Sequence, residues 1–159
     1  MRVVGYAREV PGADDGESVF SQGEYVRRWV NQHGHRLIAM FQDPRGAAEP
    51  PDLSGFEAMR KVLAGGGIDA VIVDRLEAFS PDIVRQEIAM WDIGALGTRI
   101  ISCRGEEGSA ELRATLRDVL SKVHEYQSRF VDESSEDHLI FPLDLDAQDL
   151  VVELLPHSA

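Results

Sequence analysis

The sequence predicts an α/β domain in which short apolar strands alternate with amphipathic helices. The run 2–8 is apolar and rich in β-branched residues, and Pro11-Gly12 closes it soon afterwards, as at the end of a buried first strand. Segments with an apolar period near 3.6 follow, and glycines end them before further apolar runs. A chain of 159 residues is long enough to bury an ordinary core, so we expect one domain with a short appendage.

The elements can be assigned in order along the chain. Expected strands cover 2–8, 36–41, 68–73 and 98–103, and expected helices run from Ser18 to Gly34, from about 54 to 64, and from Ser80 to Gly94 or Gly97. In the third of these helices Ser80 is the expected N-cap, with Pro81 in the first turn. The triple glycine 65–67 precedes a strand, whereas phosphate-binding loops follow one, so it predicts a helix end and not a phosphate site.

A long helix is predicted from Ser109 onward. Its apolar residues recur in steps of four and three, which is the spacing of a heptad seam. They are Leu112, Leu116, Val119, Val123, Tyr126 and Phe130. This stripe predicts a dimer interface, and the alternative is a helix that packs only on its own sheet.

The last 29 residues form an acidic, leucine-containing tail. They carry eight acidic residues and no lysine or arginine, which is two thirds of the net charge of −12. The apolar pieces 139–143 and 150–155 suggest a short extended segment and a helical turn over 147–155, and the alternative is an exposed leftover. We therefore expect a domain at 1–130 and a tail at 131–159, and we expect no DNA-binding domain in the tail, because its charge is acidic.

The net charge disfavours DNA as a partner, because protein binding to a polyanion is driven by lysine and arginine. Arg27, Arg28, Arg36 and Arg45 could still make a local basic patch. No apolar run approaches membrane length and no leader precedes the first strand, so the expected location is the cytoplasm. The lone Cys103 predicts a buried small hydrophobe.

Several short motifs resemble the catalytic domain of the serine recombinases, the resolvase and invertase family. They are Tyr6-Ala7-Arg8 at the end of the first strand, Gln22 in the first helix, Gly55 at the start of the second, and the block from Asp74 to Asp82. The resemblance covers about residues 1–130. It implies a three-layer fold: a mostly parallel sheet of four or five strands, helices on both faces, and a long C-terminal dimerisation helix.

The resemblance also implies which residues would be catalytic, and most are replaced. The nucleophilic serine falls on Val10, which has no lone pair to attack phosphorus. Arg8 is retained, Glu77 stands for an aspartate, and the places of three phosphate-binding arginines are taken by Leu53, Ala78 and Pro81. In the family an aspartate is followed directly by an arginine in this block, and a rival alignment places that pair at Asp74-Arg75. Since cations supply most of phosphoryl-transfer catalysis, we expect no activity by the family's route.

Three function hypotheses follow. The leading one is a catalytically inactive, homodimeric interaction or regulatory module that resembles a serine recombinase, with another protein as a candidate partner through the acidic tail. The second is an active site-specific recombinase with a displaced nucleophile such as Ser18 or Ser21. The third is an inhibitory partner that forms mixed dimers with an active recombinase.

No cofactor or metal is expected. Acidic residues near the strand ends could approach one another and bind a hard cation, but no spacing enforces this. They are Asp14, Asp15, Glu17 and Glu77. His33 and His35 flank Gly34 and make a weak candidate metal pair, because no cysteine or further histidine lies nearby in the sequence.

Overall fold

The structure is a computed structural model that describes residues 1–9, 18–43, 53–106, 108–130, 138–142 and 149–153. For 127–130 and the last two ranges it describes the backbone only. The chain divides into two compact units, Met1–Gly108 and Ser109–Ala159. The division predicted from the sequence, at residue 130, stays a prediction about the limits of the family-like domain.

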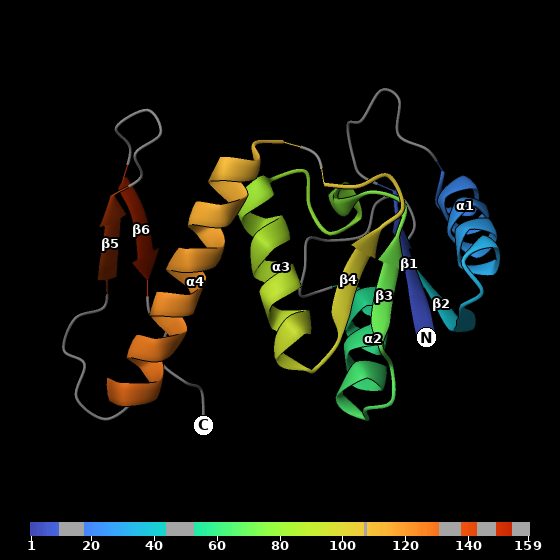
Figure 1. The fold of residues 1–159 in the computed structure, drawn as a ribbon, viewed down its shortest axis with the longest axis horizontal. Coiled ribbons are helices and arrows are strands. Elements are labelled where there is room, and N and C mark those ends of the chain that lie inside the picture. The colour runs from blue at the N-terminus through green and yellow to red at the C-terminus, as the bar shows by residue number, and fades with distance from the viewer. Residues whose placement is uncertain (10–17, 44–52, 107, 131–137, 143–148, 154–159) are drawn as a thin grey trace. The chain divides into compact units, whose positions relative to one another are not determined.

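The first unit is built on a parallel sheet of four strands (Figure 1). The strands are β1 (Arg2–Arg8), β2 (Arg36–Asp43), β3 (Ala70–Val73) and β4 (Arg99–Ser102). They lie in the order β2-β1-β3-β4, so the first strand is central, and all pairings are parallel. Except for Arg2, every residue of β1 is buried, which explains its continuous apolar sequence.

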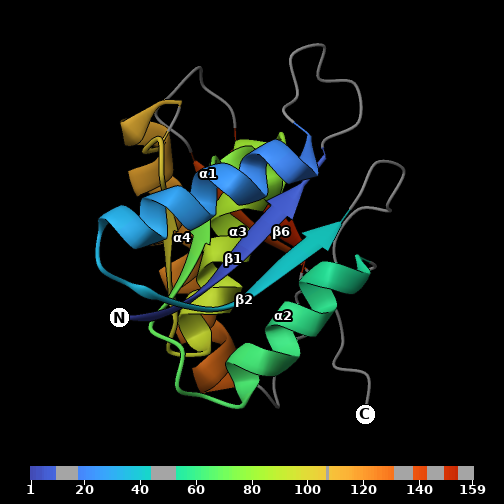
Figure 2. The same ribbon diagram turned by 90° about the vertical axis from the view of Figure 1, so that its right-hand side faces the viewer.

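Helices cover both faces of this sheet. They are α1 (Val19–Gln32), α2 (Ser54–Ala64) and α3 (Ile83–Ala95). Figure 2 shows α1 and α2 on opposite sides of β1 and β2. The side chains of β1 alternate accordingly: Val3 packs in a cluster with Val26 of α1, whereas Val4 packs in a cluster with Met59 of α2. The predicted three-layer α/β fold is confirmed.

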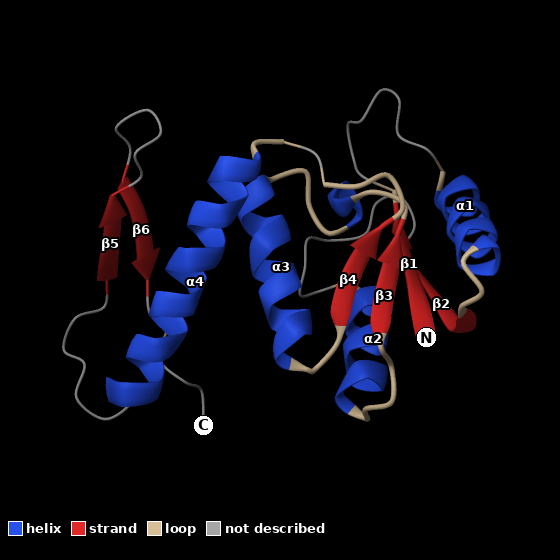
Figure 3. Cartoon of the chain, in the orientation of Figure 1, coloured by secondary structure: helices blue, strands red, loops and turns tan. Residues whose placement is uncertain are grey.

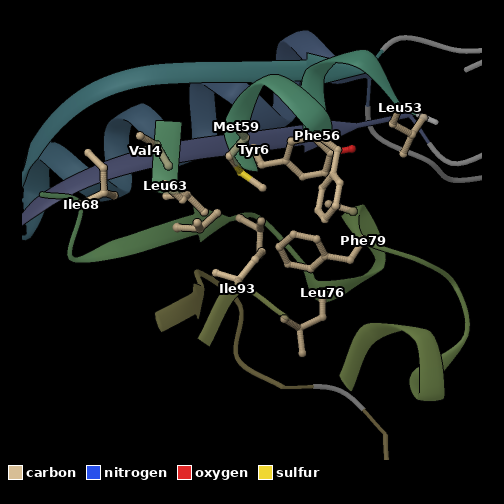
Figure 4. Packing of buried hydrophobic residues seen from close by; sticks show 13 residues of the cluster. Val4, Tyr6, Leu53, Phe56, Met59, Leu63, Ile68, Leu76, Phe79 and Ile93 are labelled. Atoms are coloured by element: carbon tan, nitrogen blue, oxygen red, sulfur yellow. The ribbon is translucent and has the colours of Figure 1, made fainter. Parts of the chain in front are cut away.

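The larger core cluster lies on the α2 and α3 side of the sheet (Figure 4). Three aromatic rings pack at its centre. Tyr6 stacks on Phe79 with ring centroids 5.7 Å apart and meets Phe56 edge to face at 5.6 Å. Such contacts add to the stabilisation from apolar burial. They join the end of β1 and the start of α2 to the segment after β3.

The predicted cap of the third helix is wrong by two residues. A short 3-10 helix, η1 (Leu76–Ala78), follows β3, and α3 begins only at Ile83. Asp82 is the N-cap, because its Oδ1 accepts a hydrogen bond from the Val84 amide at 2.8 Å. Ser80 instead accepts from the Asp82 amide and so shapes the turn before the helix. A carboxylate caps a helix as well as a hydroxyl does. Because Asp82 is the cap, Pro81 precedes the helix and is not in its first turn.

The second unit contains α4 (Ala110–Phe130) and the strands β5 (His138–Pro142) and β6 (Asp149–Glu153) (Figure 3). The predicted helical turn over 147–155 is wrong, since β6 pairs antiparallel with β5 and Leu139 faces Val152 in the register. Two apolar, β-branched segments close in sequence can satisfy each other's backbone groups, which favours a strand pair over an isolated helical turn. Neither strand joins the four-stranded sheet.

Within the described ranges, no helix combines the length and apolar character that crossing a bilayer requires.

Candidate functional site

The carboxyl ends of parallel strands are the usual place for a site in an α/β fold. Here β1 ends at Arg8 and β2 at Asp43, and β3 leads into the block from Asp74 to Asp82. All three strand ends lie at one edge of the sheet, because β1 pairs in parallel with both neighbours. The structure thus brings together the retained arginine and most of the other positions singled out by the resemblance.

Arg8 is held by the protein itself. The Gln22 side chain forms two hydrogen bonds with the Arg8 backbone. Gln22 Nε2 donates to the Arg8 carbonyl at 2.7 Å, and the Arg8 amide donates to Gln22 Oε1 at 3.2 Å. The guanidinium Nη1 donates to the carbonyl of Phe79 at 3.2 Å, and the residue is only 1% exposed. Arg8 therefore ties β1 to α1 and to the segment after η1, with its charge away from solvent.

A buried carboxylate that the sequence analysis missed organises the same edge. Asp43 is 1% exposed and accepts three hydrogen bonds: from the Tyr6 hydroxyl at 2.9 Å, the Gly55 amide at 2.8 Å and the Phe56 amide at 2.9 Å. The last two donors belong to the first turn of α2, whose N-cap residue Leu53 makes no side-chain capping bond. Asp43 thus caps α2 from another strand, where a negative charge also favours the helix dipole.

This arrangement explains Gly55. A Cβ at this position would lie 2.5 Å from the Gln42 carbonyl oxygen and 2.9 Å from Asp43 Oδ2. Backbone oxygen cannot move aside, so only glycine lets the start of α2 approach the end of β2 this closely. Gly55 was found in the sequence only through the family resemblance, and its physical role is this contact.

The Tyr6 hydroxyl, which donates to Asp43, is a poor nucleophile because of its environment. Burial raises the pKa of Tyr6 far above its ordinary value, and the hydrogen bond to Asp43 and the charge of Asp43 raise it further. The phenol therefore stays protonated and donates to Asp43. Its role is to join β1 to β2.

Two of the three positions that the resemblance assigns to arginines lie in the hydrophobic core. Leu53 is fully buried and Ala78 is 4% exposed, and both belong to the cluster around Tyr6 and Phe79 (Figure 4 labels Leu53). Pro81 is exposed and Glu77 is half-buried in η1. Val10, at the nucleophile's place, lies outside the described residues.

The rival aspartate–arginine pair, Asp74-Arg75, follows β3 directly. Asp74 is 3% exposed, and its Oδ1 receives a hydrogen bond from Arg104 Nε at 2.8 Å. The Arg104 guanidinium also lies over the ring of Tyr25, 4.6 Å from its centroid. Asp74 therefore takes part in a charged contact that joins β3 to the segment after β4 and to α1.

Ser18 and Ser21, the candidate displaced nucleophiles, form the start of α1. Ser18 Oγ accepts from the Ser21 amide at 3.1 Å as the N-cap, and the two hydroxyl oxygens are also 3.1 Å apart. Capping uses a lone pair of the Ser18 oxygen, and the hydrogen bonds of both hydroxyls are explained by the helix start.

The candidate metal ligands do not gather among the described residues. No group of three or more histidine, cysteine, aspartate or glutamate side chains in that part of the chain could hold a metal ion. His33 instead stacks on Trp29 with ring centroids 3.9 Å apart, and its centroid is 6.1 Å from that of His35. Asp14, Asp15 and Glu17 lie outside the described ranges.

Cys103 packs beside the smaller core cluster on the α1 side of the sheet. Burial raises the pKa of its thiol to about 12, and the charge of Asp74 adds to the effect. The thiol is therefore protonated at neutral pH, which suits packing and not nucleophilic chemistry.

The apolar stripe of the last helix lies along α4. Leu116, Val119 and Val123 are buried, and Leu112 and Tyr126 are half-buried. The residues between them are largely exposed, so α4 has one apolar face, as the heptad spacing predicts. The side chain of Phe130 lies outside the description. That this face forms a dimer stays a prediction.

Comparison with known proteins identifies the family. The family model described as "Resolvase, N terminal domain" matches residues 3–139. No curated protein matches the sequence. The solved structures that are similar share the fold at low identity. The N-terminal catalytic domain of TP901-1 integrase has a TM-score of 0.61 at 16% identity and covers 81% of this chain and 98% of its own.

Two further solved structures agree. A resolvase family site-specific recombinase from Streptococcus pneumoniae has a TM-score of 0.58 at 15% identity, with 84% of this chain and 94% of its own covered. The C-terminal catalytic domain of ISC1926 TnpA, an IS607-like serine recombinase, has a TM-score of 0.56 at 19% identity, with 85% and 90% covered. The match of the family model over most of the chain, together with this fold, shows that the protein belongs to the serine recombinases, the resolvase family.

Proposed function

We propose that this protein is a non-catalytic serine recombinase that acts as a homodimeric interaction or regulatory module. The observation that carries the proposal is the burial of Leu53 and Ala78 in the hydrophobic core, at positions where the resemblance expects phosphate-binding arginines. A site for phosphoryl transfer needs cations that face the phosphate. Core residues cannot supply them, and a side chain of arginine size placed in the core would strain the packing around it.

The environment of Arg8 supports the same conclusion. The Arg8 guanidinium is buried and donates to the Phe79 carbonyl, which is a structural use of the charge. Loss of one electrostatic contact typically slows a reaction about a hundred- to a thousandfold, and several are replaced here. The carboxyl-terminal edge of the sheet would then serve only to hold the fold together.

A plasmid assay tests the loss of catalysis. The full chain is incubated with supercoiled plasmid, and nicked and linear products are compared with those of an active serine recombinase. We expect no product above buffer alone. The Ser18→Ala and Ser21→Ala variants are assayed beside the parent. If the parent cleaves the plasmid and either substitution abolishes cleavage, that serine is the displaced nucleophile and the proposal is wrong.

The homodimer has a separate test in light scattering at tens of micromolar protein. A seam variant, Leu112→Gln with Tyr126→Gln, is compared with a control pair on exposed positions of the same helix, Ala114→Gln with Ser121→Gln. We expect a dimeric parent, a weakened seam variant and an unchanged control. A parent that stays monomeric at these concentrations contradicts the dimer, whatever the plasmid assay shows.

A further inference from the structure

The outermost strand β2 has a neighbour on one side only. It pairs with β1, and no described strand lies on its other side, which we call the open side of β2. Figure 2 shows β2 beside β1 at the margin of the sheet, between α1 and α2. The apolar residues at 37 and 39–41 are only half-buried, whereas every apolar residue of the central strand β1 is buried. The strand β2 therefore still has apolar surface that a further strand could cover.

The open side presents backbone hydrogen-bonding groups. The Arg36 amide and the Asp43 carbonyl bond to the residues just before and just after β1, at 2.9 and 3.2 Å, so both residues direct their backbone groups toward β1. Because these directions alternate along a strand, Leu37, Met40 and Gln42 direct theirs to the open side. Within the described residues these groups form no hydrogen bond. The start of α2 approaches the Gln42 carbonyl, but the Gln42 amide and both Met40 groups remain available.

Exposed apolar side chains gather at the open side. Three of the five large apolar side chains that are exposed in the described part of the chain lie on β2 or on the helices beside it. The first is Ile38, which is 38% exposed. It is the extra residue of a bulge, because the register passes from Val3 beside Leu37 to Val4 beside Ala39. Bulges re-aim side chains, which explains an exposed isoleucine in a strand.

The other two are Phe20 of α1, which is 72% exposed, and Val62 of α2, which is 40% exposed. Phe20 lies one turn before Gly23, where a Cβ would be 3.2 Å from Gln42 Nε2, so it is on the side of α1 that borders β2. Val62 lies two turns after Gly55, where a Cβ would be 2.5 Å from the Gln42 carbonyl oxygen. The two side chains therefore flank the open side on opposite faces of the sheet.

The charge where β2 begins, at the amino-terminal edge of the sheet, is positive. Arg36 is exposed, and Arg2 stands beside it in the register. Neither guanidinium forms an ion pair within the described ranges. On the α1 side, by contrast, Arg27 is paired with Glu24 at 2.8 Å. A guanidinium offers two parallel donors that match a carboxylate, so an acidic residue is the complementary neighbour for Arg36.

Two alternatives fit these observations less well. Bulges and charged residues often protect an outermost strand from pairing, but this bulge interrupts only 37–38, and 39–43 pair regularly with β1. Pairing of β2 with a second copy would be antiparallel about a two-fold axis. It would bring the end of one β2 to the start of the other, where Asp43 is buried and already accepts three hydrogen bonds. Arg36 would then still lack a carboxylate.

We propose that the open side of β2 binds an extended segment of a partner protein, which adds a fifth strand to the sheet and places an acidic residue beside Arg36. Backbone hydrogen bonds to the open-side groups provide affinity, as in other cases of strand addition. Alternate side chains of the added strand point to opposite faces of the sheet. Its apolar side chains therefore pack beside Val62 on one face and beside Phe20 on the other.

The partner segment therefore has a defined chemistry: extended, with apolar residues at alternate positions and an acidic residue at the end that meets Arg36. This surface is built from β2 and the sides of α1 and α2 that border it. The proposal does not depend on the loss of catalysis or on a homodimer through α4, so either of those can fail without affecting it.

Fluorescence anisotropy with the full chain tests the proposal. The probe is a fluorescein-labelled peptide in which valine and threonine alternate, with glutamate at both ends so that either strand direction places a carboxylate beside Arg36. Gln42→Pro removes an open-side amide and leaves the ladder to β1 intact. Ile38→Gln removes an apolar side chain of β2, and Ile88→Gln is its matched control, since Ile88 is 43% exposed on α3. Thermal unfolding is recorded for every variant, so that only folded proteins are compared.

We expect Gln42→Pro to weaken peptide binding about tenfold and Ile38→Gln about threefold, with Ile88→Gln changing it less than about twofold. Arg36→Gln should weaken binding about threefold, and Arg28→Gln, on the exposed side of α1, less than that. Equal weakening by the two isoleucine variants, or unchanged binding by Gln42→Pro, would overturn the proposal. So would failure of the parent to bind the peptide.

Amide hydrogen exchange followed by NMR locates the bound peptide. In the free protein the Met40 and Gln42 amides should exchange faster than the Phe41 amide, which points toward β1, and the peptide should slow both. Peptide binding that leaves these two amides unchanged would place the site elsewhere and overturn the proposal. If the same amides are slowed by raising the protein concentration without peptide, the occupant is a second copy and the proposed partner segment is wrong.

Discussion

The two edges of the sheet use charged residues in opposite ways. At the carboxyl-terminal edge Arg8, Asp43 and Asp74 are buried, and each is bound to other groups of the protein. At the amino-terminal edge Arg2, Arg36 and Arg99 are exposed and form no ion pair with the rest of the described chain. A buried charge with satisfied hydrogen bonds contributes to stability, whereas an exposed one leaves stability almost unchanged and is available to a partner. The contrast predicts that the charged residues of the carboxyl-terminal edge contribute more to the free energy of unfolding than those of the amino-terminal edge.

The largest expected effect is at Asp43. Asp43→Ala leaves the Tyr6 hydroxyl and the Gly55 and Phe56 amides without their acceptor, and should lower the free energy of unfolding by about 3–5 kcal/mol. Chemical denaturation measures it. Tyr6→Phe removes a single donor and should cost only about 1–2 kcal/mol. A loss below about 1 kcal/mol for Asp43→Ala would show that this edge is not the stabilising one.

Gly55→Ala should come next, at about 2–3 kcal/mol, because the new methyl group meets the Gln42 carbonyl. Gly94→Ala in α3 is the matched control. No atom lies within 4 Å of a Cβ built at Gly94, so this change should stabilise the protein by about 0.5–1 kcal/mol through helix propensity. Chemical denaturation should show a lower free energy of unfolding for Gly55→Ala and a higher one for Gly94→Ala. A change of the same sign in both variants would contradict the close approach of α2 to β2.

Arg104→Gln should lower the free energy of unfolding by about 1–3 kcal/mol. The substitution leaves the buried Asp74 carboxylate without its 2.8 Å partner and removes the contact over Tyr25. Arg27→Gln is the comparison, since Arg27 and Glu24 are about half exposed and their pair should contribute less than about 0.5 kcal/mol. Equal losses in thermal or chemical unfolding would remove the distinction between buried and exposed pairs.

The amino-terminal edge should tolerate substitution. Arg2→Gln, Arg36→Gln and Arg99→Gln, made singly, should each change the free energy of unfolding by less than about 0.5 kcal/mol, because the side chains are exposed and have no ion pair within the described residues. A loss above about 1.5 kcal/mol for any of them would mean that this arginine is structural, and the contrast between the two edges would fail.

The smallest effect concerns pH. The pKa of His35 is lowered in the folded protein, so the unfolded chain takes up this proton first as the pH falls. Stability should therefore decrease slightly as the pH is lowered through the ordinary histidine pKa, about 6.5, and toward the folded pKa. His35→Gln should reduce the difference between melting temperatures at neutral and mildly acidic pH. An unchanged difference would show that folding does not lower the pKa of His35.

The order of the helices and strands could be predicted from local sequence patterns. The helix predicted over 54–64 is α2 to the residue, and the four strand predictions each overlap a strand of the sheet. Apolar residues at a period of 2 or 3.6, and glycines at helix ends, are local signals. They predict an element correctly where tertiary packing favours the same secondary structure. The two errors lie where local signals compete: Ser80 and Asp82 are both good caps, and the segment 149–153 suits a strand once a second strand is available.

The family motifs predicted the position of the candidate site, but the roles of its residues depend on contacts between distant segments. Nothing in the sequence near Asp43 announces a cap for α2, because its partners Tyr6, Gly55 and Phe56 are 12 to 37 residues away. The adjacency of Arg2 and Arg36 is likewise invisible along the chain, since the two residues become neighbours only when β1 and β2 pair in parallel. Sequence patterns report local geometry, whereas hydrogen-bond partners and charge clusters depend on which distant segments pack together.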